Sequence, residues 1–311
     1  MTGKKKVTDM KKVLLLLNAG SGTGQAKNRM FEILKELTLA GFEVTTYPIV
    51  PDRGMTSEKI IQQCAGRFDI IMCVGGDGTL NHVVNSVVQA GIREPIAYLP
   101  TGSTNDFARS LGIPAEPEEY CRALSAGTTF AYDIGRFNDR YFNYVAAFGA
   151  FTQVSYETNQ ASKNVLGYAA YLLQSIVTFP ESIAMRCHLV IEHDGEREEG
   201  EYLYGAISNT TSIAGIPSPL IRKSEMDDGV FEVTLIQAPD SLGDVREILT
   251  ALASGKMDGD YVKVFRTDRL HIRVVGDAAW TLDGEYGGAP EEIDISVCPK
   301  RIRMIVPEET E

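Results

Sequence analysis

The sequence is poor in features that mark several large classes of protein. Its five cysteines are scattered, odd in number and form no C-x-x-C pair, which excludes a disulfide framework and a cysteine-rich zinc site. Basic residues number 30 against 42 acidic ones, and the net charge of -12 argues against nucleic acid as the main partner. No apolar run approaches the ~20 residues that cross a bilayer. The basic start leads into the short apolar run Val13 to Leu17, so no signal peptide is indicated and we expect a cytoplasmic protein with reduced thiols.

One short basic segment runs against this acidic balance. Lys4, Lys5, Lys6, Lys11 and Lys12 all fall near the start of the chain. We expect a solvated, frayed terminus, and contact with anionic lipid head groups is the alternative.

The first part of the chain alternates short apolar runs with amphipathic segments. Val13–Leu17 is typical of a strand buried on both faces of a parallel sheet. Gln25–Ala40, with Met30, Leu34 and Leu37 at helical spacing, indicates a crossover helix. The alternation predicts a doubly wound α/β domain with ligands at the carboxyl ends of its strands. The other expected elements are strands over Phe42–Pro48, Asp69–Val74 and Pro95–Leu99, and helices over Thr56–Ala65, from Thr79 and from Thr104.

The pattern changes near residue 128, after which short β-rich segments are separated by turn residues. This pattern predicts a β-sandwich, interrupted by helices over Leu166–Val177 and Leu242–Ser254. We expect a nucleotide-binding domain over 1–130, joined by 299–311, an acceptor domain over 131–298, and a cleft between the two. The expected strands are Ala131–Phe137, Tyr141–Ala147, Met185–His193, Tyr202–Ser208, Val230–Gln237, Leu270–Val275 and Glu292–Val297, with a hairpin tip at Asp194-Gly195.

The segment Gly75-Gly76-Asp77-Gly78-Thr79 stands between an apolar strand and a helix-like segment. Its glycines let the backbone approach a ligand, and the first amides of a helix point outward, so the turn predicts a phosphate site. A carboxylate beside phosphates repels them unless a cation lies between, so Asp77 indicates a magnesium nucleotide. The alternative is an ordinary glycine-rich turn in which Asp77 caps the helix.

Two further polar turns follow neighbouring predicted strands. Asn18 to Gly24 lacks both the Lys-Ser/Thr of a P-loop and the spacing of a dinucleotide fold. Pro100 to Asp106 follows the strand expected at Pro95–Leu99. Because loops at the ends of neighbouring parallel strands converge, we expect Asp77 and Asp106 to face one ligand region, which then requires a divalent cation.

A fourth segment, Thr281 to Glu285, lies in the β-rich half. Asp283-Gly284 between two strand-like runs is typical of a hairpin turn. The alternative is a functional carboxylate, because an Asp at this point could orient and deprotonate an attacking hydroxyl in phosphoryl transfer.

Together and in this order, the four segments resemble the bacterial diacylglycerol kinase-like lipid kinases, and the resemblance covers nearly the whole chain. The Gly-Gly-Asp-Gly-Thr turn alone is shared with NAD kinases and, more loosely, phosphofructokinases. The run Thr104 to Ala108 is the lipid-kinase version of its loop. The matching segments are Asn18-x-x-Ser21-Gly22, Gly75–Thr79, Gly102–Ala108 and Asp283-Gly284-Glu285, and Phe148–Phe151, Leu166–Tyr168 and Asp227–Phe231 are also family-like.

The resemblance implies ATP- and Mg²⁺-dependent transfer of the γ-phosphate to the hydroxyl of diacylglycerol or a related lipid alcohol. Asp77 and Asp106 would organise the catalytic magnesium. Asp283 would be the proton acceptor, with Glu285 close by. Carried over by position, the nucleotide contacts are Asn18, Ala19, Gly20, Ser21, Gly22, Thr46, Gly75, Gly76, Asp77, Gly78, Thr79, Leu80, Asn81, His82, Ser103, Thr104 and Asn105.

The resemblance also implies a second magnesium site in the β-rich half, at Glu225, Asp228 and the backbone carbonyl of Val230. An acidic surface turn is the alternative for these residues. A lipid substrate further implies that the protein visits the inner face of the membrane, and members of this family often pair as homodimers.

The chain departs from the family pattern at several positions. Ala19 stands where proline is usual, and His82 stands where glutamate is common, which puts any acidic role of that position in doubt. Ile213 and Ile216 replace smaller residues near the acceptor region, so we expect a lipid preference that differs from that of the family.

Two other functions compete with the lipid kinase. An NAD kinase is expected to carry an Asn-Glu pair for ribose at the start of the β-rich half, and we find none. A nucleotide-binding regulator without catalysis is expected to lack the base, whereas Asp283-Gly284-Glu285 is intact.

Overall fold

The computed structural model describes residues 10–18, 25–102, 105–126, 128–149, 186–209, 212–213, 216–217, 226–254 and 259–308. The helix expected over Leu166–Val177 lies outside these residues. The chain divides into two units, which we call unit 1 (Met1–Ala131 with Ile302–Glu311) and unit 2 (Tyr132–Arg301). No helix in the described part of the chain is long and apolar enough to cross a bilayer.

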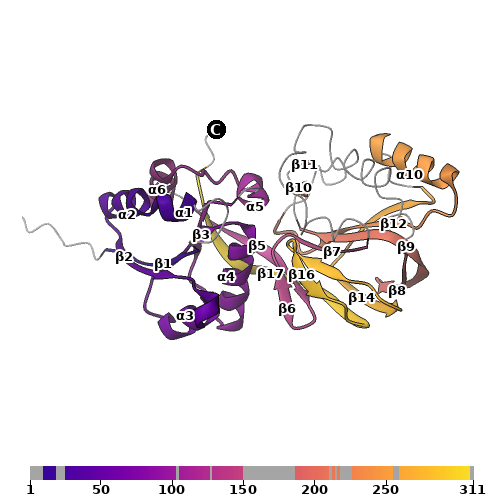
Figure 1. The fold of residues 1–311 in the computed structure, drawn as a ribbon, viewed down its shortest axis with the longest axis horizontal. Coiled ribbons are helices and arrows are strands. Elements are labelled where there is room, and N and C mark those ends of the chain that lie inside the picture. Colours follow the sequence, from indigo (N-terminus) through magenta and orange to yellow (C-terminus); the bar gives the residue numbers. More distant parts are fainter. Residues whose placement is uncertain are drawn as a thin grey trace, which may run out of the picture. The chain divides into compact units, whose positions relative to one another are not determined.

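Unit 1 is built on a parallel sheet in the order β2-β1-β3-β4 (Figure 1). The central strand β1 (Lys12–Leu17) pairs with β2 (Glu43–Pro48) on one side and β3 (Ile70–Gly75) on the other, and β4 (Ile96–Pro100) follows β3. Every residue of β3 and β4 is buried, which is why these strands read as continuous apolar runs. Since the strand order reverses beside β1, the carboxyl ends of β1 and β3 form the point where such sheets bind ligands.

Helices cover both faces of this sheet. Helices α2 (Met30–Leu39) and α6 (Pro117–Ala126) lie on one face, and α3 (Ser57–Cys64) and α4 (Asp77–Gln89) lie on the other (Figure 1). The chain thus has the doubly wound α/β domain that the alternation predicts. The remaining elements here are α1 (Gln25–Asn28), the 3₁₀ turn η1 (Pro51–Arg53) and α5 (Asp106–Ser110).

The helix expected over Gln25–Ala40 differs from the structure in two respects. It is split at Arg29, which precedes α2 with φ -99° and ψ 3°. The side chains that α2 buries are Ile33 and Leu37, four residues apart, whereas Met30 is 39% exposed. Leu37 of the expected stripe is buried and Leu34 is half-buried, so the stripe differs only at its start, where Ile33 is buried in place of Met30.

Unit 2 is an antiparallel β-sandwich, as the β-rich pattern predicts. Its central strand β9 (Glu196–Ser208) pairs with β8 (Cys187–His193) along its first half and with β7 (Val145–Gly149) and β12 (Phe231–Gln237) along its second half. The core between the strands contains Trp280, whose ring lies 4.8 Å from that of Phe148. The other elements are β6 (Arg140–Phe142), β10 (Ser212–Ile213), β11 (Ile216–Pro217), α10 (Leu242–Ser254), β13 (Val262–Thr267), β14 (Arg269–Val275), β15 (Trp280–Leu282) and β16 (Glu285–Gly288), while β5 (Thr128–Phe137) and β17 (Glu292–Val306) extend into both units.

Two features of unit 2 depend on turn chemistry. The hairpin tip expected between β8 and β9 is present, with Asp194 and Gly195 at φ 50° and 82°. The single strand expected over Tyr141–Ala147 is instead divided into β6 and β7, because Asn143 and Tyr144 direct their N–H groups to the carboxylate of Asp283.

Candidate functional site

Three of the loops singled out in the sequence meet at the carboxyl ends of β1, β3 and β4. Asn18 follows β1, and its Nδ2 donates to Oγ1 of Thr79 at 2.9 Å. The backbone N–H of Asn18 also donates to the carbonyl of Val74 at 3.1 Å. After β4, the N–H of Thr101 donates to the carbonyl of Gly75 at 2.8 Å. The structure thus brings together residues that lie far apart in the chain, as expected for neighbouring parallel strands.

The turn after β3 leads directly into α4. Gly76 precedes α4 in an extended conformation, with φ -92° and ψ -178°. As a glycine it has no side chain that could cap the first N–H groups of the helix. Asp77 lies in the first turn of α4 and is half-buried. An N-terminus of this kind presents backbone N–H groups and a positive dipole end to an anion.

The residues that follow on α4 fall into two groups. Thr79, Leu80 and Asn81 are buried, so any contact that they make with a ligand is through the backbone or at the edge of the core. His82 is exposed.

Among the predicted nucleotide contacts, Thr46 lies within β2, paired with Leu15 of β1, and not in a loop.

The loop after β3 and the loop after β4 approach so closely that a side chain does not fit between them. A Cβ added to Gly102 would lie 2.7 Å from the Cα of Gly76, which is a backbone atom that cannot rotate away. Asn105 holds the same loop, since its Oδ1 accepts from the N–H of Gly102 at 3.0 Å and its Nδ2 donates to the carbonyl of Gly102 at 2.8 Å. Asn105 itself has φ 52°, a left-handed conformation that asparagine tolerates well.

Asp77 has a partner that the sequence did not indicate. The hydroxyl of Tyr98, which is fully buried on β4, donates to Oδ1 of Asp77 at 3.4 Å. Beneath the turn, burial raises the pKa of the Cys73 thiol, and the nearby Asp77 carboxylate adds to this effect, so the thiol is neutral. A half-buried carboxylate beside helix amides is a donor type that fits Mg²⁺ bound to a nucleotide.

Several predicted site residues lie outside what the structure describes. They are Ala19, Gly20, Ser21, Gly22, Ser103, Thr104 and Glu225, together with the side chain of Asp106, which begins α5.

In unit 2, Asp283 and Gly284 form the two-residue turn between β15 and β16. Their φ angles are 51° and 84°, and Leu282 pairs with Glu285, as in a type I′ hairpin. The Asp283 side chain is 4% exposed and turns inward. Its Oδ2 accepts from the N–H of Asn143 at 2.7 Å, and its Oδ1 accepts from the N–H groups of Tyr144 at 2.9 Å and Val145 at 3.1 Å.

This carboxylate therefore organises the segment between β6 and β7. The N–H of Asp283 also donates to the carbonyl of Val145 at 2.8 Å, so the two segments are linked in both directions. Nearby, burial and then the charge of Asp283 raise the pKa of Tyr132 well above its ordinary value. Glu285, two residues further on at the start of β16, is exposed.

The acidic turn at residues 226–230 (below, the acidic turn) has its own network. Oδ1 of Asp228 accepts from the N–H of Val230 at 3.2 Å, and Oδ2 pairs with the guanidinium of Arg266. Because both oxygens of Asp228 are engaged by protein groups, one of them by a cation, the described donors do not fit a magnesium site as they stand.

Asp133, on β5, was missed by the sequence analysis. It is fully buried, and its carboxylate accepts from the N–H of Gly229 at 2.7 Å and from the N–H of Lys300 at 2.7 Å. It thereby anchors the acidic turn to β17. The available signal was one acidic residue within the apolar strand Tyr132-Asp133-Ile134.

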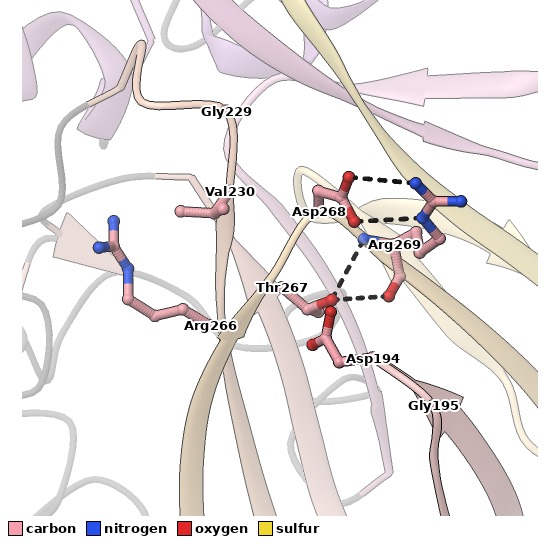
Figure 2. Close-up of a pocket in the computed structure, with 8 residues that line it drawn as sticks. All are labelled: Asp194, Gly195, Gly229, Val230, Arg266, Thr267, Asp268 and Arg269. Atoms are coloured by element: carbon pink, nitrogen blue, oxygen red, sulfur yellow. Dashed lines mark hydrogen bonds and ion pairs between the residues drawn. The ribbon is translucent and has the colours of Figure 1, made fainter.

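A surface pocket of about 710 Å³ lies beside the acidic turn (Figure 2). Arg266 extends to one side of its strand, and the Asp268–Arg269 pair extends to the other. Val230 is the one sequence-predicted site residue in its lining, and all of the lining residues belong to unit 2. The lining residues are Asp194, Gly195, Gly229, Val230, Arg266, Thr267, Asp268 and Arg269.

Comparison with known proteins assigns both halves of the chain. Residues 12–137 match the family model described as diacylglycerol kinase catalytic domain, and residues 145–306 match the YegS C-terminal NAD kinase beta sandwich-like domain. Proteins named diacylglycerol kinase from Staphylococcus aureus strains bovine RF122 / ET3-1 and MRSA252 are each 31% identical over 281 residues, covering 89% of this chain and 87% of theirs.

Solved structures from Bacillus anthracis str. Sterne share the fold. One, described as a candidate diacylglycerol kinase, has a TM-score of 0.79 at 23% identity and covers 99% of both chains. Another, described as a diacylglycerol kinase, has a TM-score of 0.73 at 21% identity and covers 97% of this chain and 98% of its own. From its sequence matches and its two-domain architecture, the chain belongs to the diacylglycerol kinase family.

Proposed function

We propose that this protein is an ATP- and Mg²⁺-dependent lipid kinase that transfers the γ-phosphate of ATP to the hydroxyl of diacylglycerol or a related lipid alcohol. The observation that carries the proposal is the junction of three polar loops at the carboxyl ends of β1, β3 and β4, where α4 begins without a side chain at its N-cap, Gly76. The relatives named diacylglycerol kinase, at 31% identity, support the reaction class.

In this proposal unit 1 binds the nucleotide. The backbone amides at the start of α4 hold phosphate oxygens, and the glycines at 76 and 102 keep the backbone close to them. Asp77 and Asp106 would hold Mg²⁺, which when bound neutralises phosphate charge and polarises the transferred group. Asn18 at the end of β1 is joined to the first turn of α4 through the hydrogen bond from its Nδ2 to Thr79.

In unit 2 we assign different roles to the two acidic residues of the hairpin. The three N–H groups that donate to Asp283 stabilise its anionic form, which makes it a poor proton acceptor. We therefore infer that Asp283 is a positioning residue that shapes the hairpin. Glu285 is exposed at the adjacent position and is the better candidate to accept the proton of the lipid hydroxyl.

The proposal is tested by transfer of label from [γ-³²P]ATP. The purified protein with Mg²⁺ is offered a panel of acceptors: diacylglycerol in phosphatidylglycerol vesicles, phosphatidylglycerol alone, polyprenol, a sphingoid base and NAD. We expect labelling of diacylglycerol or another lipid alcohol, and a loss of at least about 100-fold in the Asp77→Asn variant. Labelling of NAD would indicate a soluble acceptor, and nucleotide binding without any transfer would indicate a regulator. Either outcome overturns the proposal.

The same vesicles test the expected contact with the inner face of the membrane. The protein should sediment with anionic vesicles that contain diacylglycerol and remain in the supernatant without them. Failure to sediment under conditions that support transfer would contradict a membrane-surface reaction.

A further inference from the structure

The acidic turn concentrates negative charge in a small part of unit 2. Asp227 and Asp228 lie on the turn itself, Glu232 follows on β12, and Asp133 lies beneath it on β5. The Asp228 side chain is 19% exposed and that of Glu232 is 8% exposed. Carboxylates that are shielded from water to this degree require compensating charge.

Arg266 supplies that charge from the neighbouring strand. The pairing of β12 with β13 places Arg266 directly opposite Glu232, and its Nε lies 3.2 Å from Oε1 of Glu232. The NH2 group of the same guanidinium pairs with Oδ2 of Asp228. One planar cation thus bridges a carboxylate of the turn and a carboxylate of the strand, a geometry suited to the guanidinium fork.

The other two carboxylates are also matched by protein groups. Nζ of Lys300 lies 3.2 Å from Oδ2 of Asp227. Asp133 accepts from the backbone N–H groups of Gly229 and Lys300, each at 2.7 Å. These contacts tie the turn to β5 and β17 with the same kinds of interaction that a bound metal would otherwise supply.

We propose that Arg266 is a built-in counter-ion that takes the place of a divalent cation at the acidic turn. Mg²⁺ requires a near-ideal octahedron of oxygen ligands, and the guanidinium engages the carboxylate of Asp228 that such a site would need. The acidic turn is therefore stable without a divalent cation.

The test is thermal unfolding without nucleotide or lipid, followed by tryptophan fluorescence, which reports on Trp280, the single tryptophan, in the core of unit 2. The wild-type protein is measured in EDTA and then in excess Mg²⁺. We expect the two midpoints to agree within about 1 °C. A midpoint that falls in EDTA by several degrees and is restored by Mg²⁺ would overturn the proposal.

Variants at Arg266 test the effect of removing its positive charge and of keeping it. Arg266→Gln leaves Asp228 and Glu232 without their cation, so we expect the midpoint in EDTA to fall by about 5 °C or more. Mg²⁺ should recover part of that loss, because the carboxylates are then available to it. Arg266→Lys keeps the charge and should remain insensitive to Mg²⁺.

The matched control is Arg269→Gln. Arg269 belongs to the same pocket, but its side chain is 76% exposed and pairs with its neighbour Asp268 at 3.2 Å. We expect a change of about 1 °C or less in this control. If Arg266→Gln behaves like the control, Arg266 is not the counter-ion.

If Arg266→Gln does not fold, the EDTA and Mg²⁺ series on the wild type and on Asp228→Asn still decides the question. The midpoints of both proteins should be insensitive to Mg²⁺. Because the readout uses neither ATP nor lipid, its result is independent of the proposed kinase activity.

Discussion

Replacing Asp283 by asparagine should affect stability as well as activity, because this side chain holds three backbone N–H groups. The amide oxygen of asparagine can take the place of Oδ1 and keep the bonds from Tyr144 and Val145, now without charge assistance. The amide NH₂ then faces the N–H of Asn143, so one buried donor is left without an acceptor. An unsatisfied buried group costs ~1–3 kcal/mol, and weakening two charge-assisted bonds adds to this.

We therefore expect Asp283→Asn to lower the free energy of unfolding by ~2–4 kcal/mol. For a unit of this size, that corresponds to a fall of about 4–16 °C in the melting midpoint. Urea unfolding followed by tryptophan fluorescence is the direct assay, because Trp280 lies on β15, which leads into the turn. Measurements at pH 7 and again at 0.5 M NaCl show whether the loss persists when surface charges are screened, as expected for a side chain that is 4% exposed.

Glu285→Gln is the matched control, since it makes the same chemical change two residues away at an exposed position. It should leave the free energy of unfolding within about 0.5 kcal/mol of the wild type while it abolishes phosphoryl transfer. The reasoning fails if Asp283→Asn is as stable as the wild type, or if Glu285→Gln retains full turnover. In the second case the proton acceptor must be sought elsewhere, and Asp283 becomes the candidate again.

Three further changes test other parts of the structure. Gly102→Ala places a methyl group 2.7 Å from the Cα of Gly76, so we expect a loss of ~1–3 kcal/mol in the stability of unit 1 and weaker ATP binding by calorimetry, and unchanged binding would contradict the close approach. Tyr98→Phe removes the buried hydroxyl that donates to Asp77, which should raise the KM for MgATP several-fold with little change in the KM for the lipid; equal changes in both would refute a role in orienting that carboxylate. The pKa of His271 is raised from 6.5, mainly by its hydrogen bond to a neighbouring aspartate. The stability that this bond contributes is therefore complete below about pH 6.5 and is lost as the pH rises through the higher pKa of the folded state. The stability advantage of the wild type over His271→Gln should shrink at alkaline pH, by less than ~1 kcal/mol because the side chain is 45% exposed.

Much of the secondary structure followed from local pattern. The apolar run at Val13–Leu17 is β1, and α10 spans Leu242–Ser254, the range expected from its amphipathic sequence. Thr56 precedes α3 and accepts from the N–H of Lys59 at 3.3 Å, as an N-cap should. These features depend on residues close together in the chain, so periodicity and capping are sufficient to predict them.

Elements whose pairing is long-range were harder to predict. The strand β13 was not expected, because Lys263 and Arg266 interrupt any alternation of apolar and polar residues in Val262 to Thr267, and the segment is seen as a strand through its pairing with β12. The break between β6 and β7 was also missed, since its cause is a carboxylate about 140 positions away. The proposed nucleotide and acceptor contacts remain predictions that binding and kinetic measurements must test.

The sequence by itself determined the two-domain fold, the family and the glycine turn at Gly75–Thr79, because apolar periodicity and short motifs are local properties of the chain. Only the tertiary structure decided how individual charges are used. It placed the buried Tyr98 beneath Asp77, directed three N–H groups to Asp283, and set Arg266 between Asp228 and Glu232. The physical reason is that the chemical role of a carboxylate depends on the groups that surround it in space, and those groups come from distant strands.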